Sequence, residues 1–230
     1  TRDAAMKPTL PLLLSLNGGY VDTAGFLALQ GLFTAHVTGN FVTFGAALAL
    51  GTSGAVAKLL ALPVFCIVVV ATRLSGSLLS RKWSRVFEIL IAVKLVLLVL
   101  GAALAIHFGP FHNGDSHEAI LTGMVLVAAM AIQNAVHRIH LPTAPPSTLM
   151  TGTTTQVMID LADRIYVGDN NQVPPPARLV QMAVNVAAFA LGCGAAALLF
   201  TRVGSWCFVV PPIIAALALV MRMVGPSPAR

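Results

Sequence analysis

Residues 17–40 read NGGYVDTAGFLALQGLFTAHVTGN, and residues 131–153 read AIQNAVHRIHLPTAPPSTLMTGT. Each stretch has a polar residue inside an apolar run, then an irregular piece, then a Thr-Gly pair that opens a second apolar run. Asp22 stands sixteen positions before the first Thr-Gly pair, and Asn134 stands seventeen positions before the second. A pattern that recurs in the same order in both halves of a chain indicates an internal duplication.

Basic residues extend this correspondence into the next apolar segment. Lys58 and Lys82 flank that segment in the first half at a separation of 24, and Arg178 and Arg202 flank its counterpart at the same separation. We therefore expect one membrane domain made of two repeats. The expected repeats are residues 1–110 and residues 111–230.

The composition indicates that these segments lie in a membrane. Of the 230 residues, 57% are hydrophobic and only 10% are charged, whereas about 25% of the residues are charged in a soluble domain. The mean hydropathy of +0.86 excludes an ordinary water-soluble fold. The net charge of +6 comes from basic residues between apolar runs. It therefore indicates membrane orientation, and nucleic acid is not an expected partner.

Six apolar segments of about 20 residues are long enough to cross a hydrocarbon core about 30 Å thick. All should be helices, because lipid offers no partner to exposed backbone groups. The predicted spans are residues 9–29, 59–79, 86–106, 119–139, 179–199 and 205–223. Two further apolar stretches, 37–50 and 149–166, allow two interpretations. They are re-entrant half-helices in a six-span 3+3 inverted repeat, or they complete eight spanning segments in a 4+4 parallel repeat.

Positive charge favours the re-entrant interpretation, because Lys and Arg concentrate on the cytoplasmic side of membrane proteins. With the N-terminus inside, re-entrant segments put ten basic residues inside and two outside, whereas crossing segments give seven and five. The ten are Arg2, Lys7, Arg81, Lys82, Arg85, Arg138, Arg164, Arg178, Arg222 and Arg230, and the two are Lys58 and Arg202. The predicted fold class is an all-α polytopic membrane protein with six transmembrane helices plus two re-entrant Thr-Gly half-helix hairpins, and with both termini cytoplasmic.

The two Thr-Gly motifs form the first part of the predicted substrate site. Thr38 and Thr151 are expected N-caps, so each half-helix would direct free N–H groups and its positive dipole end toward the membrane centre. Such ends attract an anion or a polar neutral solute. The alternative is that these small residues only allow close helix packing. The predicted substrate-binding residues of the two motifs are Thr38, Gly39, Asn40, Thr151, Gly152 and Thr153.

Polar residues of the preceding spans complete the predicted site. Asp22 lies inside the first span, where a carboxylate is costly enough that function is the default interpretation. It would bind a substrate, a cation or a proton; a hydrogen bond between helices is the alternative. Asn134 is its neutral counterpart, and Gln133 beside it both donates and accepts hydrogen bonds. Arg73 and Lys94 also lie within predicted spans; we expect their long side chains to snorkel to the membrane interface, and pairing with neighbouring residues is the alternative.

These motifs resemble the YoaK-like family of bacterial inner-membrane proteins. The resemblance rests on the Asp22 motif leading to TGN at residues 38–40 and the Gln133-Asn134 motif leading to TGT at residues 151–153, and it covers nearly the whole chain. It implies a multi-pass protein of the bacterial inner membrane. The family is a domain of unknown function, so the resemblance implies no substrate.

We expect a secondary transporter or channel-like carrier of a small anionic or polar neutral solute, which proton or cation coupling could drive. The alternatives are a non-transporting membrane sensor or assembly module and, less favoured, an intramembrane enzyme. Neither a P-loop nor an HExxH motif occurs in the sequence, so we expect no enzyme activity, no cofactor and no metal. The expected partners are the solute and the lipid bilayer, and the small chain also suits a homodimer.

Overall fold

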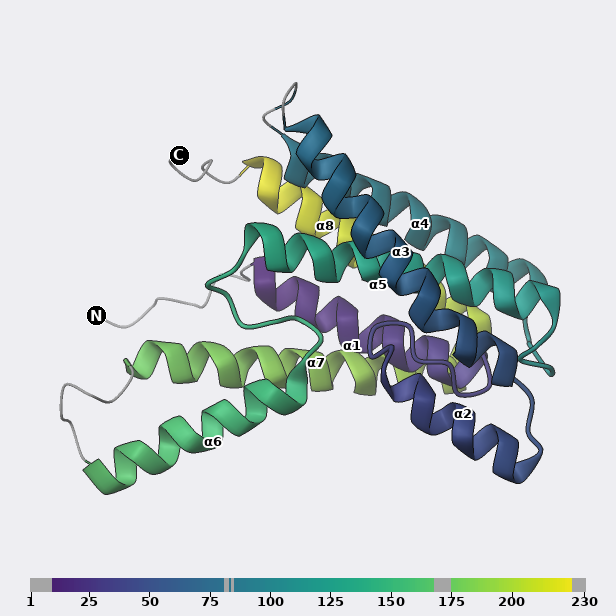
Figure 1. Cartoon of the computed structure of the whole chain (residues 1–230), viewed down its shortest axis with the longest axis horizontal. Helices are drawn as coiled ribbons and strands as arrows, with labels where there is room; N and C mark the ends of the chain where they lie inside the picture. The colour runs from purple at the N-terminus through teal and green to yellow at the C-terminus, as the bar shows by residue number, and fades with distance from the viewer. Residues whose placement is uncertain (1–9, 81–82, 84, 168–174, 225–230) are drawn as a thin grey trace.

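The apolar runs form α-helices in the computed structural model, which describes residues 10–80, 83, 85–167 and 175–224. The elements are α1 (Leu10–Ala28), α2 (Gly39–Leu50), α3 (Ala55–Leu79), α4 (Val86–Phe108), α5 (His117–His140), α6 (Met150–Val167), α7 (Pro176–Val203), the 3-10 helix η1 (Gly204–Val209) and α8 (Val210–Val224) (Figure 1). No strand occurs within these ranges, which confirms the all-α prediction. Of the basic residues used to predict orientation, Arg2, Lys7, Arg81, Lys82 and Arg230 lie outside the described residues.

Four helical stretches in the described part of the chain are long and apolar enough to cross a membrane. They are α3, α4, α5 and the continuous run Pro176–Val224, which contains α7, η1 and α8. Three predicted spans thus coincide with single helices, and the last two share one run that turns at Gly204, where φ is 56°. Helix α1 covers the remaining predicted span and contains Asn17 and Asp22, and it is not among these four stretches.

Helix α2 is apolar but has only 12 residues. At 1.5 Å per residue it is about 18 Å long, which is too short to cross a hydrocarbon core of about 30 Å. The six-span arrangement with two re-entrant hairpins therefore remains a prediction, and so does the eight-span alternative.

Two pairs of helices form the centre of the molecule: α1 packs on α7, and α3 packs on α5. Helix α4 packs on α5 and α8, while α2 lies beside α3 and α6 lies beside α7. Figure 1 shows that α2 and α6 both begin near the middle of the molecule and run in opposite directions. Helix α6 runs back toward the side where both termini lie, and α2 runs toward the far side.

Glycine lets α1 and α7 approach until their backbones touch. A Cβ added at Gly19 would overlap the carbonyl group of Phe189, and a Cβ at Gly192 would overlap the carbonyl oxygen of Leu16. Close approach through small residues is a common way for helices to associate in membranes. The Tyr20 hydroxyl, next to this crossing, donates a 2.9 Å hydrogen bond to the carbonyl oxygen of Cys207 and so ties α1 to η1.

Candidate functional site

An irregular approach segment, residues 29–38, connects α1 to α2, and Asp22 holds it in place. Oδ1 of Asp22 accepts backbone N–H bonds from Thr34 and Ala35, both at 2.7 Å, and from His36 at 3.4 Å. The Asp22 side chain is buried. Because a charged acceptor strengthens such bonds, Asp22 fixes the first approach segment against α1.

Asn40 closes the same segment at its other end. Its side chain accepts the N–H of Phe33 at 2.9 Å and donates to the carbonyl oxygen of Phe33 at 2.8 Å. Thr38 stands at the expected N-cap position of α2, but its side chain makes no capping hydrogen bond. The first amides of α2 donate instead to carbonyl groups of the preceding turn, including Gly39 N–H to the carbonyl of His36 at 2.9 Å. The expectation of free N–H groups at this end is therefore wrong.

Asn134 and Gln133 hold the second approach segment, residues 141–149. Oδ1 of Asn134 accepts a hydrogen bond from the Thr148 hydroxyl. Nε2 of Gln133 donates to the Ser147 hydroxyl at 3.1 Å and to the carbonyl oxygen of Leu14 in α1 at 2.9 Å. Asn134 and Gln133 thus hold the second approach segment in place, as Asp22 holds the first.

A fully buried lysine completes this polar cluster. The Lys94 ammonium group in α4 donates a 2.5 Å hydrogen bond to Oε1 of Gln133, and the Lys94 side chain is 0% exposed. From the sequence alone, snorkelling to the membrane interface was the favoured interpretation of Lys94. The structure shows that this interpretation is wrong. The Lys94 side chain stays in the core, because it reaches Gln133 on the neighbouring helix.

The second Thr-Gly motif does not begin its helix. Helix α6 starts at Met150, so Thr151 lies in the first turn and is not the expected N-cap. Thr151 and Gly152 are exposed, and a Cβ at Gly152 would meet nothing within 4 Å. The Thr153 hydroxyl donates to the carbonyl oxygen of Leu149 at 3.0 Å. The structure thus divides the predicted residues between the surroundings of the two approach segments and the first turn of α6, where Thr151 and Gly152 are exposed and Thr153 is buried.

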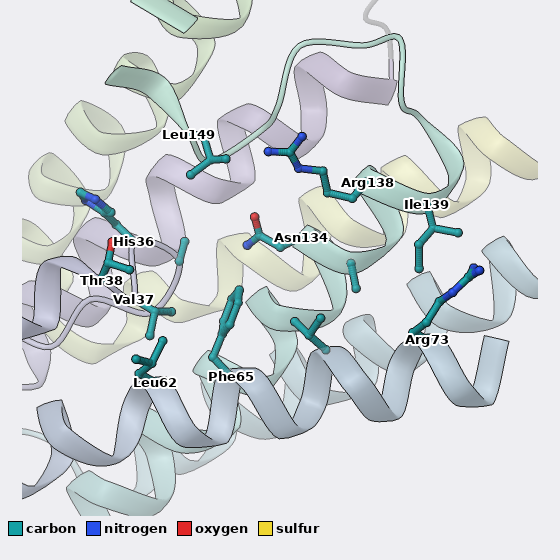
Figure 2. Close-up of a pocket in the computed structure, with 13 residues that line it drawn as sticks. His36, Val37, Thr38, Leu62, Phe65, Arg73, Asn134, Arg138, Ile139 and Leu149 are labelled. Atoms are coloured by element: carbon teal, nitrogen blue, oxygen red, sulfur yellow. The ribbon is translucent and has the colours of Figure 1, made fainter. Parts of the chain in front are cut away.

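Two of the predicted residues, Thr38 and Asn134, share a cavity of about 410 Å³ (Figure 2). The cavity lies between the first approach segment, α3 and α5. It extends from His36 and Thr38 toward the end of α5, and its walls are mostly apolar side chains such as Leu62 and Phe65. A mostly apolar cavity with a few polar groups is the usual form of a small-molecule site.

Two arginines supply the charge of this cavity. Figure 2 shows Arg138 extending from α5 toward Asn134, with Arg73 on α3 at the end far from His36. Neither guanidinium group has a hydrogen bond or ion pair with any residue that the structure describes. No Asp or Glu occurs among the described lining residues. Guanidinium groups bind carboxylates and phosphates with two parallel hydrogen bonds, so this cavity suits a small anion.

Sequence reasoning did not assign Arg73 and Arg138 to a site. Arg73 was interpreted as a snorkelling residue and Arg138 as a marker of orientation, because each lies near the end of a span. A signal was nevertheless present, since Arg73 lies inside an apolar segment, where a charge is a candidate for function. Within the described ranges, no group of three or more His, Cys, Asp or Glu residues could hold a metal ion.

These features define a polytopic α-helical membrane protein with a mostly apolar cavity whose lining includes two exposed arginines. Residues 10–221 match the family described as "Protein of unknown function (DUF1275)", and the chain belongs to this family. It is also 32% identical over 169 residues to the UPF0700 transmembrane protein YoaK of Bacillus subtilis (strain 168), which covers 71% of each chain. The resemblance to YoaK-like membrane proteins is thereby confirmed. No solved structure matches the chain.

Proposed function

We propose that this membrane protein is a carrier of small anions and that the cavity between α3 and α5 is its substrate site. The observation that carries the proposal is the presence of Arg73 and Arg138 in a cavity with no acidic group among its described lining residues. Arg73 and Arg138 are exposed residues with no ion pair to any described residue, so their guanidinium groups are accessible to an anion. A bound anion would supply a counter-ion, and Asn134 and Thr38 offer it further hydrogen bonds. We propose a carrier rather than an enzyme, with no cofactor.

A second cavity supports an inverted repeat. It has a volume of about 270 Å³ and lies between α1, α7 and the first approach segment. Its residues on α1 and α7 correspond in sequence to residues of the arginine cavity on α5 and α3. The corresponding pairs are Asp22 with Asn134, Thr23 with Ala135, Phe26 with Arg138, Phe189 with Val69, and Cys193 with Arg73. In each of the first three pairs, the two residues are the same number of positions apart in the sequence. In each of the last two pairs, they are as far apart as Lys58 and Arg178.

The packing of the helices agrees with such a two-fold relation. The contact of α1 with α7 corresponds to the contact of α5 with α3, and the position of α2 beside α3 corresponds to that of α6 beside α7. In an inverted repeat the two cavities would open toward opposite sides of the membrane. We propose that rocking of one repeat against the other alternately opens them, as in other inverted-repeat transporters, and that the termini are cytoplasmic.

Uptake into proteoliposomes tests this function. The purified protein is reconstituted, and uptake of labelled sulfate, phosphate, oxalate and succinate is compared with that of protein-free liposomes. Loss of a charged hydrogen-bonding group costs about 1.5 to 3 kcal/mol. We therefore expect Arg138→Gln to raise the KM of a transported anion about tenfold or more. Arg178→Gln is the matched control, because Arg178 is exposed on α7 and does not line the cavity.

Binding is measured separately by thermal unfolding, since a ligand that binds only the folded protein raises its Tm. At 100 times its Kd, an anion stabilises the protein by about 2.7 kcal/mol. We expect this shift in the wild type and in Arg178→Gln and a smaller shift in Arg138→Gln. If no anion raises the Tm and none is taken up, the proposal is refuted and a non-transporting module becomes the better interpretation.

A further inference from the structure

The second cavity contains a carboxylate oxygen that the fold does not use. Asp22 lines this cavity together with Thr23, His36, Cys193 and three phenylalanines. All the hydrogen bonds that Asp22 accepts from the described residues go to Oδ1. Oδ2 has no such partner, although the side chain is only 6% exposed. Oδ2 is not among the fully buried atoms that lack a partner, and Asp22 lines the second cavity, so this oxygen is accessible to a small occupant of that cavity.

The charge of Asp22 is also more than its structural role requires. The corresponding residue in the second half is Asn134, which accepts the Thr148 hydroxyl through a neutral amide oxygen and still holds the second approach segment. An amide at position 22 could accept the same N–H bonds through its own oxygen. A negative charge inside a membrane is costly. Holding the first approach segment therefore explains an acceptor at position 22 but not its charge.

The chemistry of the second cavity favours a proton over a metal cation as the occupant. Hard cations such as Mg²⁺ and Ca²⁺ take six or more oxygen ligands, and the side chains that line this cavity offer carboxylate and hydroxyl oxygens only from Asp22 and Thr23. A proton needs one carboxylate oxygen. The apolar surroundings disfavour the charged form of a carboxyl group and so favour proton uptake.

We propose that the Asp22 carboxylate is the proton-binding group of this carrier and that one proton crosses the membrane with each anion. Oδ2 takes a proton from water on the side to which the second cavity is open and releases it as H⁺ on the other side, so the carboxylate is regenerated in each cycle. This inference rests on the proposed function and names its driving ion.

The first approach segment can transmit the change in charge. Protonation turns the charged acceptor of Thr34, Ala35 and His36 into a neutral one, which weakens the three N–H bonds because charge-assisted bonds are the stronger ones. His36 lines both cavities. A shift of the segment would therefore alter the second cavity and the arginine cavity together, which is the coupling that a symporter requires.

Other titratable groups near Asp22 are few. His36 of the approach segment and Cys193 of α7 interact with it electrostatically. Helices α5, α8 and η1 also pack on α1, and no charged group on them interacts with Asp22 among the described residues. A change in pH therefore acts on the first approach segment chiefly through Asp22 and His36, and these two contributions must be separated by mutation.

Three variants separate the charge of Asp22 from its structural role. Asp22→Asn keeps an acceptor for the approach segment, Asp22→Ala removes it, and Asp163→Asn removes a carboxylate from an exposed position on α6. His36→Gln removes the other titratable group. Sulfate, phosphate, oxalate and succinate serve as probes in proteoliposomes, both for exchange at equal pH and for uptake driven by a pH gradient of one unit.

With the membrane potential held at zero by valinomycin and equal K⁺ on both sides, a one-unit pH gradient is worth a factor of ten in a one-proton equilibrium. The wild type should then accumulate a transported anion about tenfold. We expect Asp22→Asn to keep exchange and lose accumulation, Asp22→Ala to lose both, and Asp163→Asn to keep both. His36→Gln is used only for the spectroscopic measurement, because His36 lines both cavities. Tenfold accumulation by Asp22→Asn would overturn the inference. Wild-type exchange without proton-driven accumulation would also overturn it while leaving the proposed carrier intact.

Infrared difference spectroscopy provides a readout that needs no transported solute. As the pH is lowered, the wild type should gain the C=O band of a protonated carboxyl group that belongs to Asp22. The band should be absent in Asp22→Asn and present in Asp163→Asn and His36→Gln. If wild type and Asp22→Asn give the same spectra, Asp22 is not the proton-binding group, whether or not any anion is carried.

Discussion

The crossing of α1 and α7 provides a quantitative test of the structure through Gly192→Ala. A Cβ at position 192 would overlap the carbonyl oxygen of Leu16 and lie 2.9 Å from the amide nitrogen of Tyr20. Ordinary contacts of this kind are about 3.5 Å or longer. Both neighbours are backbone atoms, so no side-chain rotation can relieve the overlap, and α1 must move away from α7.

Overpacking of this kind costs about 3 kcal/mol or more when the backbone must shift. Replacing glycine by alanine inside a helix returns about 1 kcal/mol, so the net loss for Gly192→Ala is about 2 kcal/mol. Gly194→Ala is the matched control two positions along α7, because a Cβ there meets nothing within 4 Å. The control should be as stable as the wild type or more stable by up to about 1 kcal/mol.

The assay is thermal unfolding of the two variants in the same detergent. A loss of 1 kcal/mol lowers Tm by about 2 to 4 °C in a chain of this length. Gly192→Ala should therefore unfold about 4 to 8 °C below the wild type, and Gly194→Ala should not unfold below it. Equal Tm values for the two variants would refute the backbone contact and, with it, the placement of α1 on α7.

Three further predictions follow from single hydrogen bonds. Gln133→Leu leaves the buried Lys94 ammonium without its partner and should cost about 3 to 5 kcal/mol, whereas adding Lys94→Met should restore most of the stability in the same unfolding assay. Asn40→Ala leaves the N–H and C=O of Phe33 unpaired and should cost about 1 to 3 kcal/mol, and Asn40→Asp, which still accepts the N–H bond, should cost less. Tyr20→Phe removes one hydrogen bond to η1 and should lower stability by about 1 kcal/mol; an unchanged Tm would contradict that contact.

Hydropathy made much of the fold predictable. Helices α3, α4 and α5 each coincide with a continuous apolar run that is long enough to cross a membrane. Their positions could therefore be predicted from the sequence. The irregular segments before α2 and α6 were also predictable, because their Gly, Pro and polar residues interrupt the apolar pattern. The start of α6 was misplaced by two residues, because Thr151 as an N-cap predicts a helix from Gly152, whereas the backbone is already helical at Met150.

The site was harder to predict because its contacts join distant parts of the chain. Asp22 was singled out from its cost in a membrane, and the structure shows that it accepts hydrogen bonds from the first approach segment. Its bonds to residues 34–36 depend on how the segment folds back, which no local pattern specifies. The pairing of Lys94 with Gln133 and the presence of Arg73 and Arg138 in the lining of one cavity depend on the rotation of each helix about its axis. In helices that are apolar on most sides, the sequence contains little information about that rotation.

Cysteine labelling tests the central claim that α2 and α6 turn back within the membrane. Cys66, Cys193 and Cys207 are replaced by Ala, and single cysteines are introduced at Thr52, Arg202, Ser80 or Tyr166, all of which are exposed. An impermeant maleimide is then applied to intact cells and to inverted vesicles. The account predicts that positions 52 and 202 react from outside and positions 80 and 166 only from inside. Reaction of position 52 only from inside and of position 80 from outside would contradict it, because α2 would then cross the membrane.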